Sequence, residues 1–400
     1  MQKNFVIIGA GITGITTAYQ LAKLGHSVTV VEAEPYAAMM TSYANGGQLS
    51  VSNSETWTTW NNVRKGIKWV FDPGAPLLVR PWPSISKIKW LTGFLWNTAT
   101  CTYEKNTMDT IALGLAARSL YEKIAEEEGI SFDRSKCGIL HFYKNRDYFE
   151  SAIRSTEMYR KLNVDRQIIG AQEVFDLEPT LAMNGSILGG TYTASDSVGD
   201  IHKFCNELAR VLVTKYSVKI HYNTKITRVS KPWENWIMQT DNKDIYACPN
   251  VVICAGARSS EIAAMFGESI NVYPVKGYSI TITDEVHNLP KVSLLDDEAK
   301  IVTSTLGNRL RVAGTAELDD WNRDIRISRI DPLVKWVRTN LPEVNTRDIK
   351  PWAGLRPMTP SMMPIVGKGK RPGVWLNTGH GHLGWTLSPA TAAKLASLIG

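Results

Sequence analysis

The first thirty-four residues place two short apolar runs on either side of a helical pattern. The runs are Phe5 to Ile8 and Val28 to Val31, and residues 15–24 carry apolar side chains at intervals of three and four. Such spacing is typical of one face of a helix, whereas short apolar runs bounded by glycine are typical of buried strands. The pattern therefore predicts the order strand, helix, strand.

The remaining chain alternates between helical and strand patterns. Helices are predicted over 61–71, 84–97, 107–129, 147–163, 171–177, 331–340, after Asp200, and from about Pro389 onward. Strands are predicted over 218–222 and 251–257. Strict alternation of apolar and polar residues within 272–314 predicts an antiparallel sheet.

Three glycines join the first predicted strand to the first predicted helix. Gly9, Gly11 and Gly14 form G-x-G-x-x-G, and Glu32 stands at the end of the second strand. In a dinucleotide-binding unit these glycines allow a tight turn, a close pyrophosphate and close helix packing, and the acid accepts hydrogen bonds from ribose. Three glycines alone are a weak signal for a dinucleotide site. The signal becomes strong because the glycines stand between a predicted strand and helix and an acid follows the second strand. The motif predicts a dinucleotide without distinguishing FAD from NAD.

Composition narrows the class of protein. The chain has 400 residues, of which 44% are hydrophobic and 21% charged, as in a globular protein with two or three domain-sized bodies. No apolar run approaches the length of about 20 residues that a membrane helix needs. The N-terminal apolar run is predicted to be the first strand rather than part of a signal peptide. Five scattered cysteines without C-x-x-C favour a reducing cytosol, and the histidines show no metal-binding spacing, so no metal is predicted.

The basic residues do not indicate nucleic-acid binding. The net charge of +7 is spread along the chain without a long basic run.

Residues 51–100 interleave six tryptophans with lysine and arginine, and prolines divide the segment into short pieces. Two amphipathic helices here would suit peripheral contact with a lipid headgroup layer. The alternative is that the tryptophans pack the interior and the bases are solvated.

Four further segments carry a resemblance to a known family. They are T-S-Y-A-N-G-G-Q-L-S at 41–50, Y-P-V-K-G-Y-S at 273–279, G-L-R-P-M-T-P at 354–360 and N-T-G-H-G-H-L-G-W-T at 377–386. With these segments in this order, nearly the whole chain resembles the D-amino-acid oxidase superfamily of flavoenzymes. Within it, the chain is most similar to the bacterial D-amino-acid dehydrogenases of the small-subunit type.

The resemblance implies FAD as the cofactor and an α/β fold. A Rossmann-like FAD-binding domain of the glutathione-reductase type would be interleaved with an α+β substrate domain built on an antiparallel sheet. The expected ranges are 1–60, 170–262 and 350–400 for the FAD-binding domain, and 61–169 and 263–349 for the substrate domain.

The resemblance also implies the residues that contact the substrate. Oxidising an amino acid at Cα needs orientation from the protein more than acid or base catalysis. Arg356 is expected to bind the substrate carboxylate through two parallel hydrogen bonds. Tyr278 either donates a second hydrogen bond or packs in the sheet, and His380 either faces the flavin and substrate or is structural. Gln48 is expected near the flavin ring, and His382 receives no role.

The FAD site is expected to combine the glycine turn with loops that follow later strands. The implied residues are Gly9, Gly11, Gly14, Glu32, Thr41, Ser42, Asn45, Gly46, Gly47, Gln48, Ile226, Ala255, Gly256, Gly379, Gly381, Leu383, Gly384, Trp385 and Thr386. Thr41 and Ser42 are expected near the pyrophosphate, and Ile226 near adenine. The late glycines are expected to give N–H groups to the O2/N1 side of the flavin.

These expectations favour FAD-dependent oxidative deamination of D-amino acids, with electrons passed to a quinone or the respiratory chain. An oxidase that uses O2, of the glycine, sarcosine or D-amino-acid type, remains an alternative, as does a D-proline or D-hydroxyproline dehydrogenase. A flavin-bound subunit without activity of its own is a third. The expected location is the cytoplasm, with peripheral contact at the inner face of the cell membrane through 51–100.

Overall fold

The protein is described by a computed structural model covering residues 1–69, 75–80, 82–181, 186–283 and 288–400. Its first strand and helix are β1 (Asn4–Ile8) and α1 (Ile12–Lys23), followed by β2 (Ser27–Val31). These form the centre of a six-stranded sheet in the order β19-β20-β13-β1-β2-β9. Every pair in it is parallel except β19 with β20. The other strands are β9 (Lys219–His221), β13 (Asn250–Ile253), β19 (Ile365–Lys368) and β20 (Val374–Thr378).

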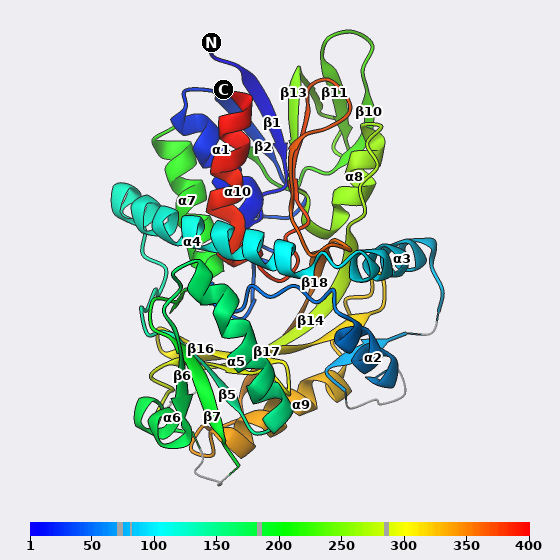
Figure 1. The fold of residues 1–400 in the computed structure, drawn as a ribbon. Helices are drawn as coiled ribbons and strands as arrows, with labels where there is room; N and C mark the ends of the chain where they lie inside the picture. Colours follow the sequence, from blue (N-terminus) through cyan, green and yellow to red (C-terminus); the bar gives the residue numbers. More distant parts are fainter. Residues whose placement is uncertain (70–74, 81, 182–185, 284–287) are drawn as a thin grey trace.

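Both faces of this sheet are covered, as the apolar runs predict for parallel strands. Phe5 and Ile7 pack against α1, α7 (Ile201–Thr214) and α10 (Gly384–Ile399). Val6 and Ile8 face the other core, which is closed by α8 (Ser259–Met265) and a three-stranded sheet (Figure 1). That sheet consists of β10 (Ile226–Ser230), β11 (Trp236–Thr240) and β12 (Ile245–Cys248).

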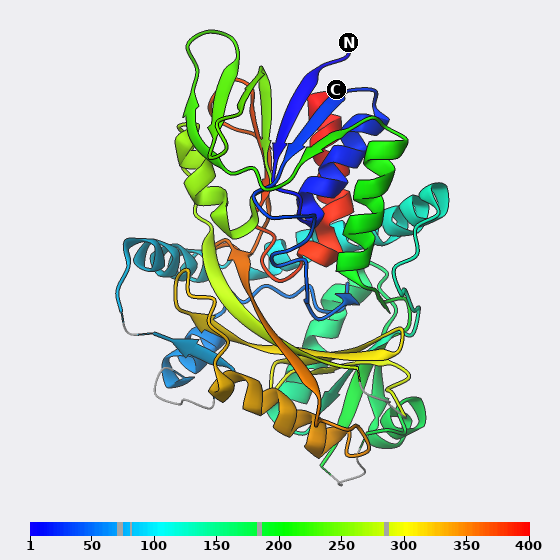
Figure 2. The same cartoon turned by 180° about the vertical axis from the view of Figure 1, so that it is seen from behind.

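The second large element is a nine-stranded mixed sheet. Its order is β18-β14-β17-β16-β15-β5-β7-β6, with β4 paired to β17. Its strands are β4 (Leu77–Val79), β5 (Ile139–Tyr143), β6 (Arg166–Gly170), β7 (Gly189–Thr193), β14 (Tyr273–Ile282), β15 (Ser293–Asp296), β16 (Ile301–Leu306), β17 (Arg309–Leu318) and β18 (Ile349–Met358). Helix α9 (Ile327–Asn340) packs on the outer face, and the other face is turned toward the six-stranded sheet (Figure 2).

The remaining elements join or flank the two sheets. Helix α4 (Tyr103–Glu128) packs on α10 between them (Figure 1). The others are β3 (Gln48–Leu49), α2 (Trp60–Trp69), α3 (Ile85–Ala99), α5 (Arg146–Lys161), α6 (Ala171–Leu177), β8 (Ser197–Val198) and the 3₁₀ turn η1 (Gly256–Arg258). The helices predicted from 84 to 177 are present within a few residues. The helix predicted over 61–71 is α2, and its last two predicted residues lie outside the described ranges.

One helix start was predicted wrongly. Helix α10 begins at Gly384, five residues before Pro389, and the proline lies inside it. A proline inside a helix leaves the carbonyl four residues earlier without its N–H partner. Here that carbonyl belongs to Trp385, and the buried hydroxyl of Tyr121 donates to it. A tertiary contact therefore replaces the hydrogen bond that the sequence alone suggests is lost.

Two strands lie in a different sheet from the one expected. Both β7 and β18 fall within ranges predicted for the FAD-binding domain, 170–262 and 350–400, yet both belong to the nine-stranded sheet. The chain therefore crosses between the two sheets more often than the predicted ranges allow. The exact division into domains stays a prediction.

Candidate functional site

The glycine turn after β1 has the geometry of a dinucleotide-binding loop. Gly9 has a φ of +105°, and a Cβ there would lie 2.6 Å from the carbonyl oxygen of Cys254. A Cβ at Gly14 would lie 1.8 Å from the Gly9 carbonyl oxygen, so only glycine lets α1 approach this closely. At Gly11 the nearest atom is Ser42 Oγ at 3.5 Å. A Cβ at the middle glycine would therefore meet only this hydroxyl, at an ordinary contact distance, so the turn is less crowded here than at Gly9 and Gly14.

The start of α1 offers donors for an anion. Ile12 N–H donates to Ser42 Oγ at 3.2 Å, while the N–H groups of Gly11 and Thr13 have no acceptor within the described ranges. Free N–H groups and the helix dipole together favour a phosphate here. Thr41 is placed differently from its neighbour, because its hydroxyl donates to the carbonyl oxygen of Leu355 at 2.6 Å. Ser42 thus lies at the helix, and Thr41 contacts β18.

Glu32 lies at the end of β2 with both carboxylate oxygens engaged. Oε2 accepts from Ala10 N–H at 2.5 Å, and Oε1 accepts from Glu34 N–H at 2.9 Å. Each oxygen keeps a further lone pair, which suits a ribose hydroxyl. Burial raises the pKa of Glu32, and the backbone N–H of Ala10 opposes that shift. Ile226 is buried close by, at the start of β10 in the core that also holds Val31.

The loop before β3 packs on the face of the nine-stranded sheet. Asn45 Oδ1 accepts from Gly47 N–H at 3.0 Å, and Gln48 Nε2 donates to Ser293 Oγ at 2.9 Å. A Cβ at Gly46 would lie 2.4 Å from Val302 Cγ2. The small residues in this loop therefore allow close approach to β16. They were predicted to allow close approach to a flavin, and the structure gives them this packing role in addition.

The strand β13 runs into the same region. Its last residue is followed by Cys254, whose N–H donates to Ile8 O at 3.0 Å. Ala255 and Gly256 come next, and Gly256 has a φ of +54°. The first glycine turn approaches Ala255 closely, because a Cβ on Gly9 would lie 3.3 Å from Ala255 Cα. These two residues therefore lie beside the predicted dinucleotide path.

The C-terminal glycine loop connects β20 to α10. Gly379 and Gly381 have φ values of +75° and +59°. Gly381 N–H donates to the carbonyl oxygen of Pro357 at 2.9 Å, so the prediction that it donates to the flavin is not supported. At the start of α10, the N–H groups of Gly384 and Trp385 have no acceptor in the described part of the chain. These two groups are the better donors for an anionic ring edge.

The side chains after this loop anchor it to the first one. Trp385 Nε1 donates to Gly47 O at 3.3 Å, and Thr386 Oγ1 accepts from Ser50 N–H at 3.2 Å. Leu383 is buried, and its N–H donates to His380 O at 3.0 Å. The two loops that were predicted to enclose the flavin are therefore joined directly.

His380 is held by the last helix. Its Nε2 lies 2.8 Å from Thr391 Oγ1, and the ring is buried. Burial lowers the pKa of His380 to about 3, so the ring is neutral at physiological pH. Of the two alternatives for this residue, the arrangement favours the structural one.

Arg356 lies flat on the neighbouring strand. It is on β18, which pairs antiparallel with β14, and a Cβ at Gly277 of β14 would lie 2.2 Å from Arg356 Cζ. Nη1 donates to Thr315 O at 3.1 Å. Nε and Nη2 have no partner among the described residues, which leaves one edge of the guanidinium free. Burial lowers the pKa of Arg356 to about 10, so the side chain stays charged at neutral pH.

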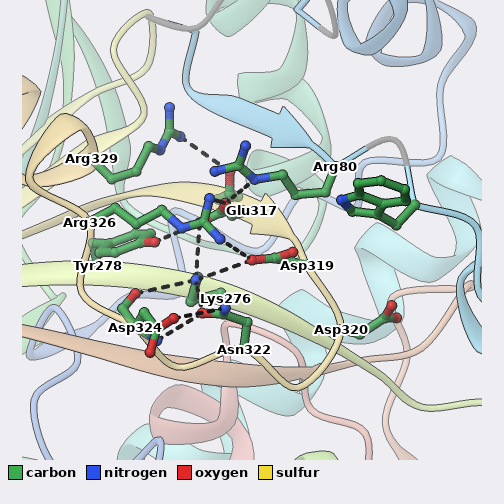
Figure 3. A network of polar contacts seen from close by, with 12 residues as sticks. Arg80, Lys276, Tyr278, Glu317, Asp319, Asp320, Asn322, Asp324, Arg326 and Arg329 are labelled. Carbon is green, nitrogen blue, oxygen red and sulfur yellow. Dashed lines mark hydrogen bonds and ion pairs between the residues drawn. The ribbon is translucent and has the colours of Figure 1, made fainter.

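Tyr278 lies on the opposite face of β14, because successive residues of a strand alternate. Its hydroxyl donates to Glu317 Oε2 at 2.6 Å, and Lys276 Nζ lies 3.2 Å from the same oxygen (Figure 3). Arg80 Nε and Arg326 Nη1 contact the other oxygen of Glu317 (Figure 3). The structure therefore does not bring Tyr278 to Arg356, and it agrees with the alternative in which Tyr278 packs in the sheet.

His382, which the sequence analysis left without a role, lies near Arg356. Its ring stacks on Trp57 with centroids 4.8 Å apart. Burial and, to a smaller extent, the charge of Arg356 together lower the pKa of His382 to about 3.

The tryptophan-rich segment 51–100 divides between interior and surface. Trp90 is buried and its Nε1 donates to Met358 O at 2.9 Å, and Lys87 is buried with Nζ 2.8 Å from Trp82 O. By contrast, α3 exposes one apolar face. Its exposed residues recur at helical spacing and are Ile85, Ile88, Leu95 and Trp96. The interior alternative therefore holds for Trp90, whereas membrane contact through the exposed face of α3 stays a prediction.

Comparison with known proteins defines the class to which this site belongs. The model of the FAD dependent oxidoreductase family (DAO) matches residues 4–398, and the chain belongs to this family of flavoenzymes. The family is FAD-dependent, so FAD is the cofactor of this chain. The glycine turn and Glu32 stay the predicted residues that hold it, and the uncrowded Gly11 fits that prediction.

Among its relatives, the chain is 50% identical to "D-amino acid dehydrogenase 3" of Mesorhizobium japonicum, over 99% of this chain and 97% of that protein. It is 35% identical to a D-amino acid dehydrogenase of Dechloromonas aromatica, over 98% and 96% of the two chains.

Solved structures share the fold at lower identity. Glycine oxidase from Geobacillus kaustophilus matches with a TM-score of 0.80 and 20% identity, over 100% of this chain and 95% of that one. L-proline dehydrogenase from P. horikoshii matches with a TM-score of 0.77 and 17% identity, over 100% and 93%. The predicted α/β fold, with a Rossmann-like FAD-binding unit and a second part built on an antiparallel sheet, is therefore confirmed, although two pairs of that sheet, β15 with β5 and β17 with β4, are parallel.

Proposed function

We propose that this flavoenzyme oxidatively deaminates D-amino acids. The observation that carries the proposal is the free edge of the Arg356 guanidinium, held flat over Gly277 between the two glycine loops. A planar guanidinium with a free edge binds a carboxylate through two parallel hydrogen bonds and so sets its orientation. The name shared by the relatives from Mesorhizobium and Dechloromonas supports D-amino acids as the substrate class.

Hydrogen bonds of the two residues that flank Arg356 support this role. Thr41 donates to Leu355 O, and Gly381 donates to Pro357 O. These bonds connect the loop after β2 and the loop before α10 to the residues that flank Arg356. A carboxylate on the guanidinium therefore lies at the junction of the predicted flavin loops.

The chemistry divides between cofactor and protein. FAD, when bound, accepts the hydride from Cα and so supplies the redox step. The protein orients the amino acid through Arg356 and leaves the amine lone pair to assist loss of the hydride. The resulting imino acid then reacts with water to give a 2-oxo acid and ammonia. The N–H groups of Gly384 and Trp385 are placed to stabilise negative charge on a ring edge.

Anaerobic reduction of the flavin tests the proposed activity. A panel of D-, L- and N-methyl amino acids is mixed with the oxidised protein, and flavin absorbance is followed. Selective bleaching by D-amino acids is expected. Arg356→Ala is expected to raise KM or lower the bleaching rate by at least about a hundredfold with FAD retained, because the charged hydrogen bonds to the substrate are lost. No bleaching by any amino acid would contradict the proposal.

The electron acceptor is proposed to be a quinone or another component of a respiratory chain. The reduced protein is mixed in a stopped-flow instrument with air-saturated buffer or with a soluble quinone. Rapid reoxidation by quinone and slow reoxidation by O2 are expected. Fast reoxidation in air with release of peroxide would identify an oxidase instead.

Peripheral membrane contact is proposed through the exposed face of α3. The face contains Ile85, Ile88 and Trp96, which expose 88%, 53% and 71% of their surface. An exposed apolar helix face with a neighbouring base, here the exposed Lys89, suits the boundary between headgroups and acyl chains. None of the described helices is long and apolar enough to cross a bilayer. The proposed location is the cytoplasm, with reversible binding to the inner face of the cell membrane through α3.

Co-sedimentation with anionic phospholipid vesicles tests this contact. Trp96→Ser is expected to weaken binding several-fold, because the indole is a large part of the exposed apolar face. Trp233→Ser is the matched control, since Trp233 is 86% exposed but lies in the separate β10–β11 hairpin. Equal binding by wild type and both variants would exclude α3 as the contact.

A further inference from the structure

Two glycines lie directly opposite each other on neighbouring strands beside Arg356. Gly277 of β14 pairs with Gly354 of β18. The Arg356 guanidinium covers Gly277, where a Cβ would lie 2.3 Å from Nη2, and the Trp352 indole covers Gly354, where a Cβ would lie 2.0 Å from Cη2. Opposed residues of an antiparallel pair have Cβ positions about 4.5–5.5 Å apart. The indole and the guanidinium therefore lie side by side over one pair of glycines.

Trp352 and Arg356 occupy the same face of β18. Residues two and four apart on a strand point to one side, and Ala353 between them points to the other, into the core under α9. Trp352 and Arg356 are half-buried, whereas residues 353–355 are buried. The accessible part of this strand segment therefore belongs to an aromatic residue and a cation that are neighbours.

A second aromatic ring extends the surface of the indole. The ring centroid of Tyr43 lies 6.3 Å from that of Trp352, and the planes are tilted by 37°. Tyr43 is exposed and belongs to the same loop as Thr41, whose hydroxyl donates to Leu355 O on β18. We call Trp352 and Tyr43 the aromatic wall. Neither ring carries a formal charge at neutral pH, so the wall offers apolar surface beside a cation.

The wall and the C-terminal glycine loop lie on opposite sides of Arg356 along β18. Gly381 donates to Pro357 O, one residue after Arg356. In the other direction the strand leads outward, because Lys350 and Pro351 are exposed and β18 is the last strand in the sheet order. A carboxylate on Arg356 therefore has the predicted flavin loop on one side and the aromatic wall on the other.

We propose that the side chain of the substrate packs on Trp352 and that the aromatic wall favours D-amino acids with an aromatic or bulky apolar side chain. This inference rests on the proposed function and names the substrate class within it. An indole face offers a large apolar surface and gains further from contact with another ring. An ionised side chain would lose water there without gaining a partner of opposite charge in the wall.

Two simple carboxylates isolate the contact with the wall. Both 3-phenylpropionate and propionate present a carboxylate to Arg356, but only the first carries a ring that reaches Trp352. Each is titrated into the oxidised holoenzyme and followed by the flavin difference spectrum, and the ratio of the two Kd values measures the contact. Anaerobic flavin reduction by D-phenylalanine and D-alanine gives the corresponding ratio of kcat/KM.

Three variants separate the aromatic face from other effects. Trp352→Ala removes the ring over Gly354, and Trp352→Phe keeps an aromatic ring at the same place. Trp233→Ala is the matched control, because Trp233 is 86% exposed in the separate β10–β11 hairpin. The flavin-to-protein absorbance ratio of each variant reports whether FAD is retained.

Wild type is expected to prefer 3-phenylpropionate and D-phenylalanine. Trp352→Ala is expected to lower both preferences about tenfold, with propionate binding within about twofold of wild type and FAD retained. Trp352→Phe is expected to stay within about threefold of wild type, and Trp233→Ala to be unchanged. If Trp352→Ala does not fold, Trp352→Leu, which keeps apolar bulk without a ring, is expected to lower both preferences severalfold.

Three results would overturn the inference. They are a wild type that prefers the small ligands, equal weakening of both carboxylates in the Trp352 variants, and loss of FAD from folded Trp352→Ala, which would assign the indole to the cofactor. If no amino acid reduces the wild-type flavin, the proposed function fails, and the two carboxylates still test the wall. If D-amino acids reduce the flavin but the ratios do not respond to Trp352, only the role of the wall fails.

Discussion

Gly277 provides the sharpest test of the carboxylate site, because one added methyl group reaches the guanidinium directly. A Cβ at this position would lie 2.2 Å from Arg356 Cζ and 2.3 Å from Nη2. Carbon atoms in contact normally lie about 3.5–4.0 Å apart, so Gly277→Ala must displace the guanidinium by more than about 1 Å. The backbone is not the obstacle, since Gly277 lies in β14 without a positive φ.

A displacement of this size is expected to lower kcat/KM for a D-amino acid by about a hundredfold. Propionate binding is expected to weaken in parallel, while FAD content stays that of wild type, because the glycine turn at α1 is unchanged. The measurements are anaerobic flavin reduction, the propionate difference spectrum and the flavin-to-protein absorbance ratio. They isolate the carboxylate contact from the binding of the cofactor.

Gly66→Ala is the matched control for the glycine-to-alanine change. Gly66 lies in α2, and an added Cβ there has no atom within 4 Å. Its activity is expected to equal that of wild type. If Gly277→Ala keeps kcat/KM within about threefold of wild type, Arg356 does not hold the substrate in the position inferred above.

Two further predictions concern stability. Glu317→Gln is expected to lower the free energy of unfolding by about 3 kcal/mol in urea, because it removes the buried negative charge that pairs with the fully buried Lys276 at 3.2 Å and with Arg80 and Arg326. A loss below about 1 kcal/mol would contradict this. Burial alone would raise the pKa of Asp297, but Lys300 and the hydrogen bond from His141 lower it below its ordinary value. A carboxylate with a lowered pKa stabilises the folded state above about pH 4 and loses that effect as pH falls. The destabilisation caused by Asp297→Asn should therefore shrink below about pH 4, and a constant difference across pH would refute the assignment.

The sequence predicted those parts of the fold that follow from local patterns. The glycine turn and the strands around it were found because their spacing depends on neighbours in the chain. Most helices were found for the same reason. The start of α10 was missed, since Pro389 signals a helix boundary unless another group satisfies Trp385 O, and Tyr121 is 264 residues away.

The candidate site was predicted less completely because it depends on which face of a strand a residue occupies. Arg356 was predicted from its motif. The position of its guanidinium, with one edge free, depends on the missing side chain of Gly277, which lies on a different strand. Tyr278 follows Gly277 directly, and that one step turns its side chain toward Glu317 instead. His382 received no role, and its stacking partner Trp57 lies in a segment that no local pattern joins to it.

The late return of the chain to both sheets has a consequence for biosynthesis. Strand β18 supplies Arg356 at the edge of one sheet, β20 pairs with β13 in the other, and α10 packs on α1. The cores on the two faces of the six-stranded sheet are therefore incomplete until β20 and α10 have left the ribosome. Nascent chains that already hold the glycine turn must therefore stay open until translation is nearly finished, and a premature stop before residue 349 would leave a polypeptide with no finished core to resist proteolysis.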